Sequence, residues 1–315
     1  MTDMHYQYDG LETVVDFVRW GGTLFTKNRL FFGHGTDNAF DEAKTLVFHV
    51  ISLPQNVPDM YWSTRLTQSE KSAVTDMFRR RIETRKPAAY LTGEAWFAGM
   101  RFNVSEATLV PRSPIAELID ASYAPWVEAH EVKRILDMCT GSGCIGIASL
   151  AAFPEATVDL ADISPEALEV AQSNIDDYNI HAYARTVETD LFSHLQGEKY
   201  DLIVSNPPYV DEIEMQHLPA EFQTEPELGL SAGKDGLKLV RIILAEAAEH
   251  LNDDGVLIVE VGVSRYYLEQ EYPELPLFWF EFENGGEGVF AIQKSELELF
   301  QDILDERKYS ESSDA

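Results

Sequence analysis

Residues 137–146 read DMCTGSGCIG, and this stretch decides the fold of the chain. The apolar run Val132–Met138 precedes it and the helical pattern Ile145–Ala152 follows it, so we predict a glycine-rich turn between a strand and a helix. Its three glycines allow a tight turn, close approach of the backbone to a ligand, and close packing of the helix on the strand. The sequence therefore predicts a ligand-binding loop at the end of a strand.

Strands and helices alternate after this loop, which is typical of a doubly wound sheet. The expected strands are Thr157–Asp162, Thr186–Asp190, Tyr200–Ser205 and Gly255–Val261, and the expected helices are Pro165–Asn174 and Leu237–Leu251. Two final apolar runs, Leu277–Glu283 and Gly288–Gln293, flank the turn Asn284-Gly285-Gly286 and predict a hairpin. We predict an α/β fold with a seven-stranded, mostly parallel sheet and an antiparallel C-terminal hairpin.

The N-terminal part lacks this alternation and carries no pattern of catalytic residues. Apolar residues recur at helical spacing over Leu11–Phe25, Asp37–Ile51 and Gln68–Arg85. Asp37 is the expected N-cap of the second helix, and Thr67 or Ser69 that of the third.

A second pattern connects the two parts of the chain. Aromatic alternation from Ala89, with turns at Gly93 and Gly99, predicts a hairpin, and residues 111–114 open a helix that runs to about Ala124. We expect a helical domain over 1–88, a hairpin linker and connecting helix over 89–124, an α/β domain over 125–309 and a disordered tail over 310–315.

Composition restricts the class of protein. The chain has 315 residues, of which 45% are apolar, enough for a folded core. No run reaches the roughly 18 apolar residues of a membrane helix, and the polar start is unlike a secretory signal. We therefore expect a cytoplasmic protein without a membrane partner. The eight histidines and two cysteines show no metal-ligand spacing, so we expect no metal.

The formal charge of −30 is spread unevenly. Residues 131–315 hold 11 basic and 38 acidic residues, a balance of −27, whereas residues 1–130 hold 13 and 16, a balance of −3. Such a field repels phosphate backbones and attracts cationic partners; an acidic surface that serves solubility is the alternative. We give the name basic island to Arg65, Lys71, Arg79, Arg80, Arg81, Arg85 and Lys86.

Two carboxylates indicate which ligand the loop binds. Asp137 closes the preceding strand, so its charge is expected to lie beside the ligand. A carboxylate there opposes the pyrophosphate of a dinucleotide and suits a cation, and S-adenosylmethionine carries both an ammonium and a sulfonium. Asp162 ends the next strand, where an acid binds ribose hydroxyls; alternatively it caps the helix that begins at Pro165, a task that Ser164 could take. We predict an S-adenosylmethionine site.

The tetrad Asn206-Pro207-Pro208-Tyr209 follows the strand Tyr200–Ser205, at the carboxyl end of the sheet. An amide or aromatic amine nitrogen is a poor nucleophile because its lone pair is delocalised. The side-chain oxygen of Asn206 and the backbone oxygen of Pro207 could accept its two N–H bonds and direct the lone pair toward a methyl group. Tyr209 would offer a flat face to the planar group. The tetrad predicts methyl transfer to such a nitrogen, driven by positioning.

With this tetrad the sequence resembles the class I amino-methyltransferases that carry an NPPY motif and act on adenine N6 or on glutamine side chains. The resemblance spans nearly the whole chain and is specific to the glutamine-N5 methyltransferases, in particular the branch that modifies large-subunit ribosomal protein L-three. It rests on AYLTGEAWFAG, LVPRSPIAELI, LDMCTGSGCIGIA, DISPEAL, SNPPYVD and EPELGLSAGKDGL.

The resemblance implies a fold and a substrate. It implies a Rossmann-like catalytic domain over 125–309 and a substrate-recognition role for the N-terminal helical domain. The implied target is a glutamine of the basic ribosomal protein L-three, with ribosomal RNA nearby in assembling particles.

The resemblance also implies roles for single residues. The donor-contacting positions are Asp137, Cys139, Thr140, Gly141, Ser142, Gly143, Asp162, Asp190, Leu191 and Asn206. The substrate-binding positions are Arg112, Asn206, Pro207, Pro208 and Tyr209, of which Asn206, Pro207 and Tyr209 are the catalytic ones. Leu191 stands where the release-factor branch tends to carry Trp, and residues 111–115 read PRSPI where that branch has PRPETE-like acids.

Two alternative functions use the same tetrad. One is a release-factor glutamine methyltransferase; the other is an adenine-N6 methyltransferase that acts on a flipped base. The charge of residues 131–315 opposes nucleic acid, whereas the basic island favours it.

Two further acidic positions have alternative interpretations. Glu260 ends the strand Gly255–Val261 and is expected to be a solvated acid, although it could reach the site. Glu225–Leu228 is either a flap over the substrate or a surface loop.

Overall fold

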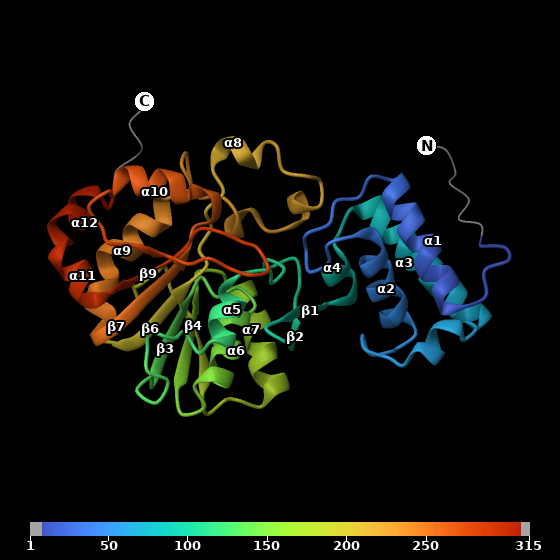
Figure 1. Ribbon diagram of the computed structural model, residues 1–315, viewed down its shortest axis with the longest axis horizontal. Helices are drawn as coiled ribbons and strands as arrows, with labels where there is room; N and C mark the ends of the chain where they lie inside the picture. Colours follow the sequence, from blue (N-terminus) through green and yellow to red (C-terminus); the bar gives the residue numbers. More distant parts are fainter. Residues whose placement is uncertain (1–7, 310–315) are drawn as a thin grey trace. The chain divides into compact units, whose positions relative to one another are not determined.

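The computed structural model describes residues 8–309, so the tail predicted over 310–315 lies outside the described residues. The chain divides into two compact units (Figure 1). The first runs to Glu94 and also takes in Pro219–Thr224, from the second half of the sequence. The second comprises Ala95–Leu218 and the residues from Glu225 onward. The sequence had not indicated that residues 219–224 belong with the N-terminal helices.

The first unit is helical, as the periodicity predicted. Thr13 and Thr67 begin α1 and α3 with capping boxes, in which a cap hydroxyl and an N3 carboxylate each accept a backbone amide. Asn38 caps α2, one residue after the expected Asp37. Aromatic side chains, among them Phe17 and Phe78, fill the core between the helices. The elements are α1 (Val14–Lys27), α2 (Ala39–Val50), η1 (Asp59–Ser63), α3 (Gln68–Thr84), α4 (Ala88–Thr92) and η2 (Phe222–Thr224).

The basic island is largely neutralised within this unit. Arg81 is fully buried, and its guanidinium bridges the buried carboxylates of Glu42 and Glu221, with Nε–Oε1 and Nη1–Oε1 distances of 2.9 and 3.4 Å. Three further arginines pair with acids, and Lys71 donates to the carbonyl of Leu11. Ion pairing of four of its seven residues weakens the attraction of the island for nucleic acid. The pairs are Arg65 with Glu12, Arg79 with Asp76 and Glu83, and Arg85 with Glu221.

The second unit is built on the predicted seven-stranded sheet, whose order is β5-β4-β3-β6-β7-β9-β8. Strands β3 to β7 are parallel, and β9 lies antiparallel to both β7 and β8. After β5 the chain crosses to the other side of β3 and forms β6, so the strand order reverses between the neighbours β3 and β6. Ligands of such sheets bind at that switch point. The strands are β3 (Arg134–Met138), β4 (Thr157–Asp162), β5 (Ala184–Glu188), β6 (Tyr200–Ser205), β7 (Leu251–Glu260), β8 (Phe278–Trp279) and β9 (Val289–Gln293).

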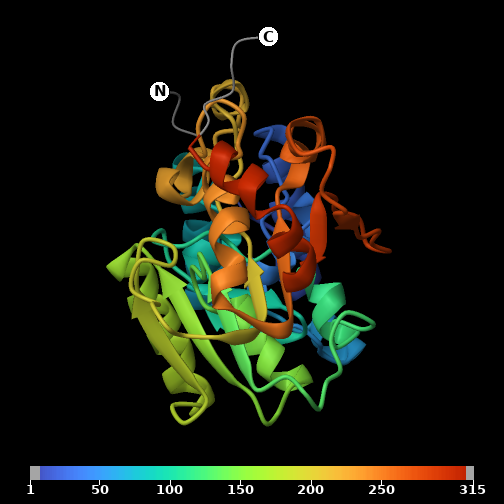
Figure 2. The same ribbon diagram turned by 90° about the vertical axis from the view of Figure 1, so that its left-hand side faces the viewer.

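Helices cover both faces of this sheet (Figure 1). On one face α9 (Lys238–His250) and α11 (Lys294–Leu299) pack against β7; Figure 2 shows α9 in orange, with α11 and α12 (Gln301–Arg307) in red, in front of the sheet. On the other face α6 (Cys144–Ala152) and α7 (Pro165–Tyr178) pack against β4. Successive residues of β3 alternate between two separate cores, as strands buried on both sides do.

Several local expectations were wrong. Residues 88–92 form the helix α4 instead of the start of a hairpin, and the hairpin is confined to β1 (Glu94–Phe97) and β2 (Met100–Asn103). The helix expected from residues 111–114 to about Ala124 is only α5 (Ile115–Asp120). Helices α10 (Arg265–Glu271), α11 and α12 were not predicted. Within residues 8–309, no helix has the length and apolar character that spanning a membrane requires.

Candidate active site

The three glycines of the loop after β3 have different structural roles. Gly146 lies on α6 so close to β4 that an added Cβ would meet Leu160 Cδ2 at 2.4 Å, and a Cβ at Gly143 would meet Leu160 Cδ1 at 3.0 Å. Around Gly141, by contrast, the nearest atom to an added Cβ is 4.0 Å away. Gly143 and Gly146 thus allow helix and strand to pack closely, and Gly141 is the one whose backbone a ligand can approach.

Asp137 lies beneath this loop with its carboxylate buried. Its Oδ2 accepts hydrogen bonds from the Thr140 hydroxyl at 2.5 Å and the Gly146 amide at 2.8 Å, whereas its Oδ1 is buried without a hydrogen-bond partner. Burial raises the pKa of Asp137 to about 7. One oxygen of Asp137 thus holds the loop, and the other has no hydrogen-bond partner and is available to a ligand. That this acid lies beside the bound ligand stays a prediction.

Asp162 ends β4 and joins the loop to the start of α7. Its Oδ2 accepts from the Gly141 amide and its Oδ1 from the Ser164 amide, both at 2.9 Å. Ser164, not Asp162, is the N-cap of α7, because its hydroxyl accepts from the Ala167 amide. Burial raises the pKa of Asp162. The capping alternative is therefore wrong, and the carboxylate lies directly under the backbone of Gly141.

Three more residues that are predicted to contact the methyl donor lie at neighbouring strand ends. Cys139 has a left-handed backbone, with φ of 59°, and burial together with the nearby Asp162, Asp137 and Asp190 carboxylates raises the pKa of its thiol. The Asp190 side chain is exposed. Leu191 also has a positive φ, 48°, yet its side chain is buried in the same core cluster as Met138 and Ala161. A non-glycine residue in this conformation is strained, which is common at ligand sites.

The other two loop positions are structural in this geometry. The Thr140 amide donates to the carbonyl of Ala161 on β4, and its hydroxyl holds Asp137. Ser142 is buried, and its carbonyl accepts from the side chain of Asn174 at 2.8 Å. Both residues fix the shape of the loop.

The tetrad begins directly after β6, which pairs with β3 so that Ser205 lies beside Met138. Pro207 and Pro208 are buried. The Asn206 Oδ1 is buried without a hydrogen-bond partner, as is the Asp137 Oδ1 one strand away. Two buried acceptor oxygens without donors, at the switch point of the sheet, fit a site whose donors arrive with ligands.

Tyr209 is fixed at three points. Its hydroxyl donates to Glu260 Oε1 at 3.0 Å, and its carbonyl accepts from the Ser264 hydroxyl at 2.9 Å. Its ring lies on Gly262, where an added Cβ would be 2.6 Å from the ring Cε2. Burial and the Glu260 carboxylate raise the pKa of Tyr209, so its hydroxyl stays a donor.

Glu260 corrects the expectation of a solvated acid at the end of β7. It is only 5% exposed, and its Oε2 accepts from the Ser113 hydroxyl at 2.5 Å. Burial raises the pKa of Glu260. The sequence placed Glu260 correctly at a strand end but could not show that Ser113 and Tyr209 enclose it.

Arg112, predicted to bind substrate, is engaged by a buried acid. Its two terminal nitrogens lie 2.6 and 2.8 Å from the two carboxylate oxygens of Glu225, which also accepts from the Val110 amide. Glu225 was expected on a flap or a surface loop; it is buried, whereas Leu228 after it is exposed. This pair fastens the segment after the tetrad to residues 110–112.

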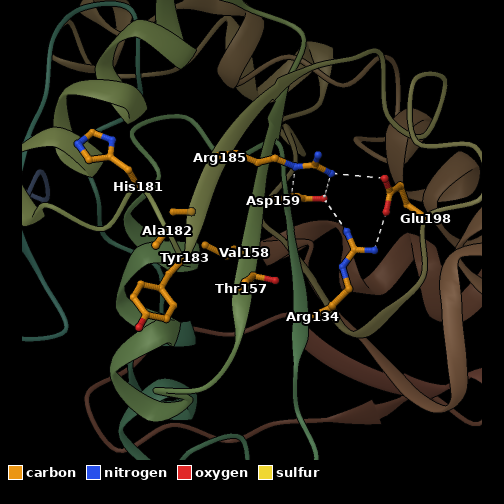
Figure 3. Close-up of a pocket in the computed structure, with 10 residues that line it drawn as sticks. Arg134, Thr157, Val158, Asp159, His181, Ala182, Tyr183, Arg185 and Glu198 are labelled. Carbon is orange, nitrogen blue, oxygen red and sulfur yellow. Dashed lines mark hydrogen bonds and ion pairs between the residues drawn. The ribbon is translucent and has the colours of Figure 1, made fainter.

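A cavity of about 390 Å³ lies at the opposite end of the sheet (Figure 3). It opens where β3, β4 and β5 begin, and Figure 3 shows Arg134 and Arg185 both bound by Asp159 and Glu198. With their arginines neutralised, these residues form a structural network remote from the tetrad. No three His, Cys, Asp or Glu side chains within residues 8–309 are grouped so as to hold a metal ion.

One family model and two relatives that match this chain are methyltransferases. The model of the methyltransferase small domain matches residues 123–224. The ribosomal protein uL3 glutamine methyltransferase of Xanthomonas campestris pv. campestris is 49% identical over 290 residues, which cover 92% of this chain and 94% of that protein. The protein of the same name from Francisella tularensis subsp. tularensis is 43% identical over 302 residues, 96% of each chain.

The chain is also similar to a solved structure of a protein bound to RNA. The hMettl16 catalytic domain, in complex with MAT2A 3′UTR hairpin 1, is 15% identical and covers 75% of this chain and 84% of that chain, with a TM-score of 0.49. A likeness of this extent carries no argument about function.

Proposed function

Because this chain belongs to the family of ribosomal protein uL3 glutamine methyltransferases, we propose that it methylates the side-chain amide nitrogen of a glutamine of uL3, using S-adenosylmethionine. The observation that carries the proposal is the buried, unpartnered Oδ1 of Asn206 at the end of β6. A buried acceptor without a donor is costly unless a ligand supplies one.

The tetrad would grip the amide through two acceptors. Asn206 Oδ1 would accept one N–H of the substrate amide and the Pro207 carbonyl the other, and the Tyr209 ring would lie against its plane. Both acceptors draw electron density toward the nitrogen and fix the direction of its lone pair. Positioning of this kind lowers a reaction barrier by several kcal/mol. Proton loss from nitrogen can follow the transfer, so a base with a tuned pKa is not required.

The loop after β3 would hold the methyl donor. The bound donor supplies an electrophilic methyl group on a sulfonium. The space around Gly141 would let the methyl donor approach the backbone. The buried Asp137 Oδ1 would accept a hydrogen bond from this cationic molecule. Asp162, which already accepts from the Gly141 amide, would accept a ribose hydroxyl with its remaining lone pairs. Leu191 would border the site through its strained backbone, since its side chain is buried.

The charge of the chain supports a basic protein substrate. Residues 131–315, which include the whole parallel sheet, have a balance of −27 from 11 basic and 38 acidic residues. Of the seven residues of the basic island that could have opposed this field, the four arginines Arg65, Arg79, Arg81 and Arg85 are paired with acids. A cationic ribosomal protein would be attracted, whereas a nucleic acid would be repelled.

A labelled-methyl transfer assay tests the proposal. Purified uL3, release factor, duplex DNA and transfer RNA are offered separately with labelled donor. We expect label on uL3, and its loss when the target glutamine, found by mass spectrometry, is changed to alanine. Labelled adenine without labelled protein would overturn the proposal in favour of a nucleic-acid methyltransferase, and label on the release factor alone would assign the other glutamine branch.

A further inference from the structure

Glu260 is a buried acid that the proposed chemistry leaves without a task. It is the last residue of β7, whose neighbour β6 leads into the tetrad, and Ser205 pairs with Val259 across the two strands. A carboxyl that is 95% removed from solvent destabilises a protein unless its oxygens are hydrogen-bonded. Both oxygens are: Oε1 accepts from Tyr209 and Oε2 from Ser113. Its place beside the tetrad therefore calls for a reason beyond packing.

The contacts of Tyr209 supply that reason. The carbonyl of Tyr209 is held by Ser264, and Gly262 lies against the Cε2–Cζ edge of its ring, but neither contact holds the phenol hydroxyl. The bond from its hydroxyl to Glu260, at 3.0 Å, fixes that end. The orientation of the ring is thus fixed by Glu260, a residue of the neighbouring strand β7.

The carboxyl is in turn held from its other side. Ser113 donates to Oε2 at 2.5 Å while its own oxygen accepts from the Ile115 amide at 3.1 Å. Ile115 begins α5, and Arg112 next to Ser113 is clamped by Glu225. Ser113 is therefore a fixed hydrogen-bond partner, whose hydroxyl can donate or accept, and the chain Ser113–Glu260–Tyr209 links three segments that are far apart in the sequence.

We propose that Glu260 is the positioning residue of the tetrad. Held by Ser113, it fixes the orientation of the Tyr209 ring through the phenol hydroxyl, so that the substrate amide packs against a ring face of defined orientation. This rests on the proposed role of Tyr209 in methyl transfer. Glu260 touches neither reacting group. It acts through geometry, and an amide in its place should serve, because Gln can accept from Tyr209 and donate to Ser113.

Four variants separate geometry from charge. Glu260→Gln keeps both hydrogen bonds and removes the charge; Glu260→Met keeps the volume and removes both bonds. Tyr209→Phe removes only the hydroxyl, and Tyr209→Phe with Glu260→Met forms the double variant. Turnover, KM for uL3, calorimetric donor affinity and melting temperature are measured for each. Crystal structures of the wild type and Glu260→Met give the tilt of the ring.

We expect Glu260→Met and Tyr209→Phe each to lower kcat roughly 10- to 100-fold, as a misplaced reacting group does. Donor affinity should stay within about 3-fold, because Glu260 does not contact the donor site. Glu260→Gln should recover most of the turnover. The double variant should be no slower than the slower single variant, since both changes break the same Tyr209–Glu260 hydrogen bond. In crystals of Glu260→Met the Tyr209 ring should be displaced.

Four outcomes would overturn the proposal. Three are wild-type turnover in Glu260→Met, additive losses in the double variant, and an unmoved ring in the crystal. The fourth is a failure of Glu260→Gln alongside Glu260→Met, which would show that the charge acts and not the geometry. Failure of the proposed substrate is distinct, because wild type would then leave uL3 unlabelled. In that case the variants are compared on whichever acceptor is labelled, and the ring position is read without any substrate.

Discussion

Asn206 carries the buried oxygen on which methyl transfer is expected to depend. We expect Asn206→Ala to lower kcat by about 100-fold or more, the effect of losing one oriented polar group at a reacting centre. Donor affinity by calorimetry should change by no more than a few fold. Asn252→Ala, which removes an exposed asparagine at the other end of the sheet, serves as the control. Unchanged turnover in Asn206→Ala would refute the grip on the amide.

Asp137 predicts a pH dependence of donor binding. Burial raises its pKa to about 7 in the folded protein, above the ordinary value of 3.8. A cationic donor favours the ionised form, so we expect affinity to rise as the pH increases through about 7, with protons released on binding. Calorimetry in buffers of different ionisation enthalpy measures both. Asp137→Asn should bind weakly at every pH, and a flat profile in the wild type would contradict the role.

The same shift sets the stability of the donor-free protein. Its sign follows from the raised pKa: between about pH 4 and pH 7 the folded state holds a proton that the unfolded state has lost. The free energy of unfolding should therefore fall with rising pH, by up to about 1.4 kcal/mol per pH unit from this group. Comparison with Asp137→Asn isolates that contribution from those of other carboxylates.

The strand ends were predictable and their surroundings were not. Asp137, Asp162 and Asn206 lie at adjacent strand ends, as the β/α alternation required. Glu260 was misjudged because its burial depends on Ser113, 147 residues away in the sequence. A hydrogen-bond partner at such a distance leaves no periodic signal in one sequence.

Helix α3 shows how far periodicity reaches. The apolar spacing predicted a helix over Gln68–Arg85 with Thr67 or Ser69 as its cap; the helix runs over Gln68–Thr84 and Thr67 is the cap. The basic residues on it gave no sign that one of them would be buried. Arg81 points inward, because Glu42 on α2 and Glu221 from residues 219–224 neutralise it. Residues 219–224 join the first unit only through tertiary packing. Their sequence, PAEFQT, has no pattern that predicts this packing.

The buried Arg81 predicts a stability difference between neighbouring arginines. Arg81→Met would leave Glu42 buried without its counter-charge, and we expect a loss of about 3–5 kcal/mol in the free energy of unfolding. Arg80→Ala, one residue earlier on the exposed face of α3, should change it by no more than about 0.5 kcal/mol. Urea denaturation compares the two. Equal effects would mean that the network does not stabilise the unit.

Charge is distributed over the molecule in a way that matters for association and not for the chemical step. The parallel sheet and its helices lie within residues 131–315, where acids outnumber bases by 38 to 11. Exposed charges of one sign act over about 8 Å at physiological salt. They raise the rate of encounter with a cationic partner while leaving kcat unaffected.

Salt should therefore separate encounter from chemistry. We expect kcat/KM for uL3 to fall roughly 10-fold between about 50 and 500 mM NaCl, because screening removes the attraction that accelerates encounter. Turnover at saturating uL3 should change little, since the grip of Asn206 and Pro207 on the amide is short-ranged. A short, uncharged peptide that carries the target glutamine is the matched control, and its kcat/KM should be nearly independent of salt. If uL3 and the peptide responded alike, the acidic field would serve solubility alone.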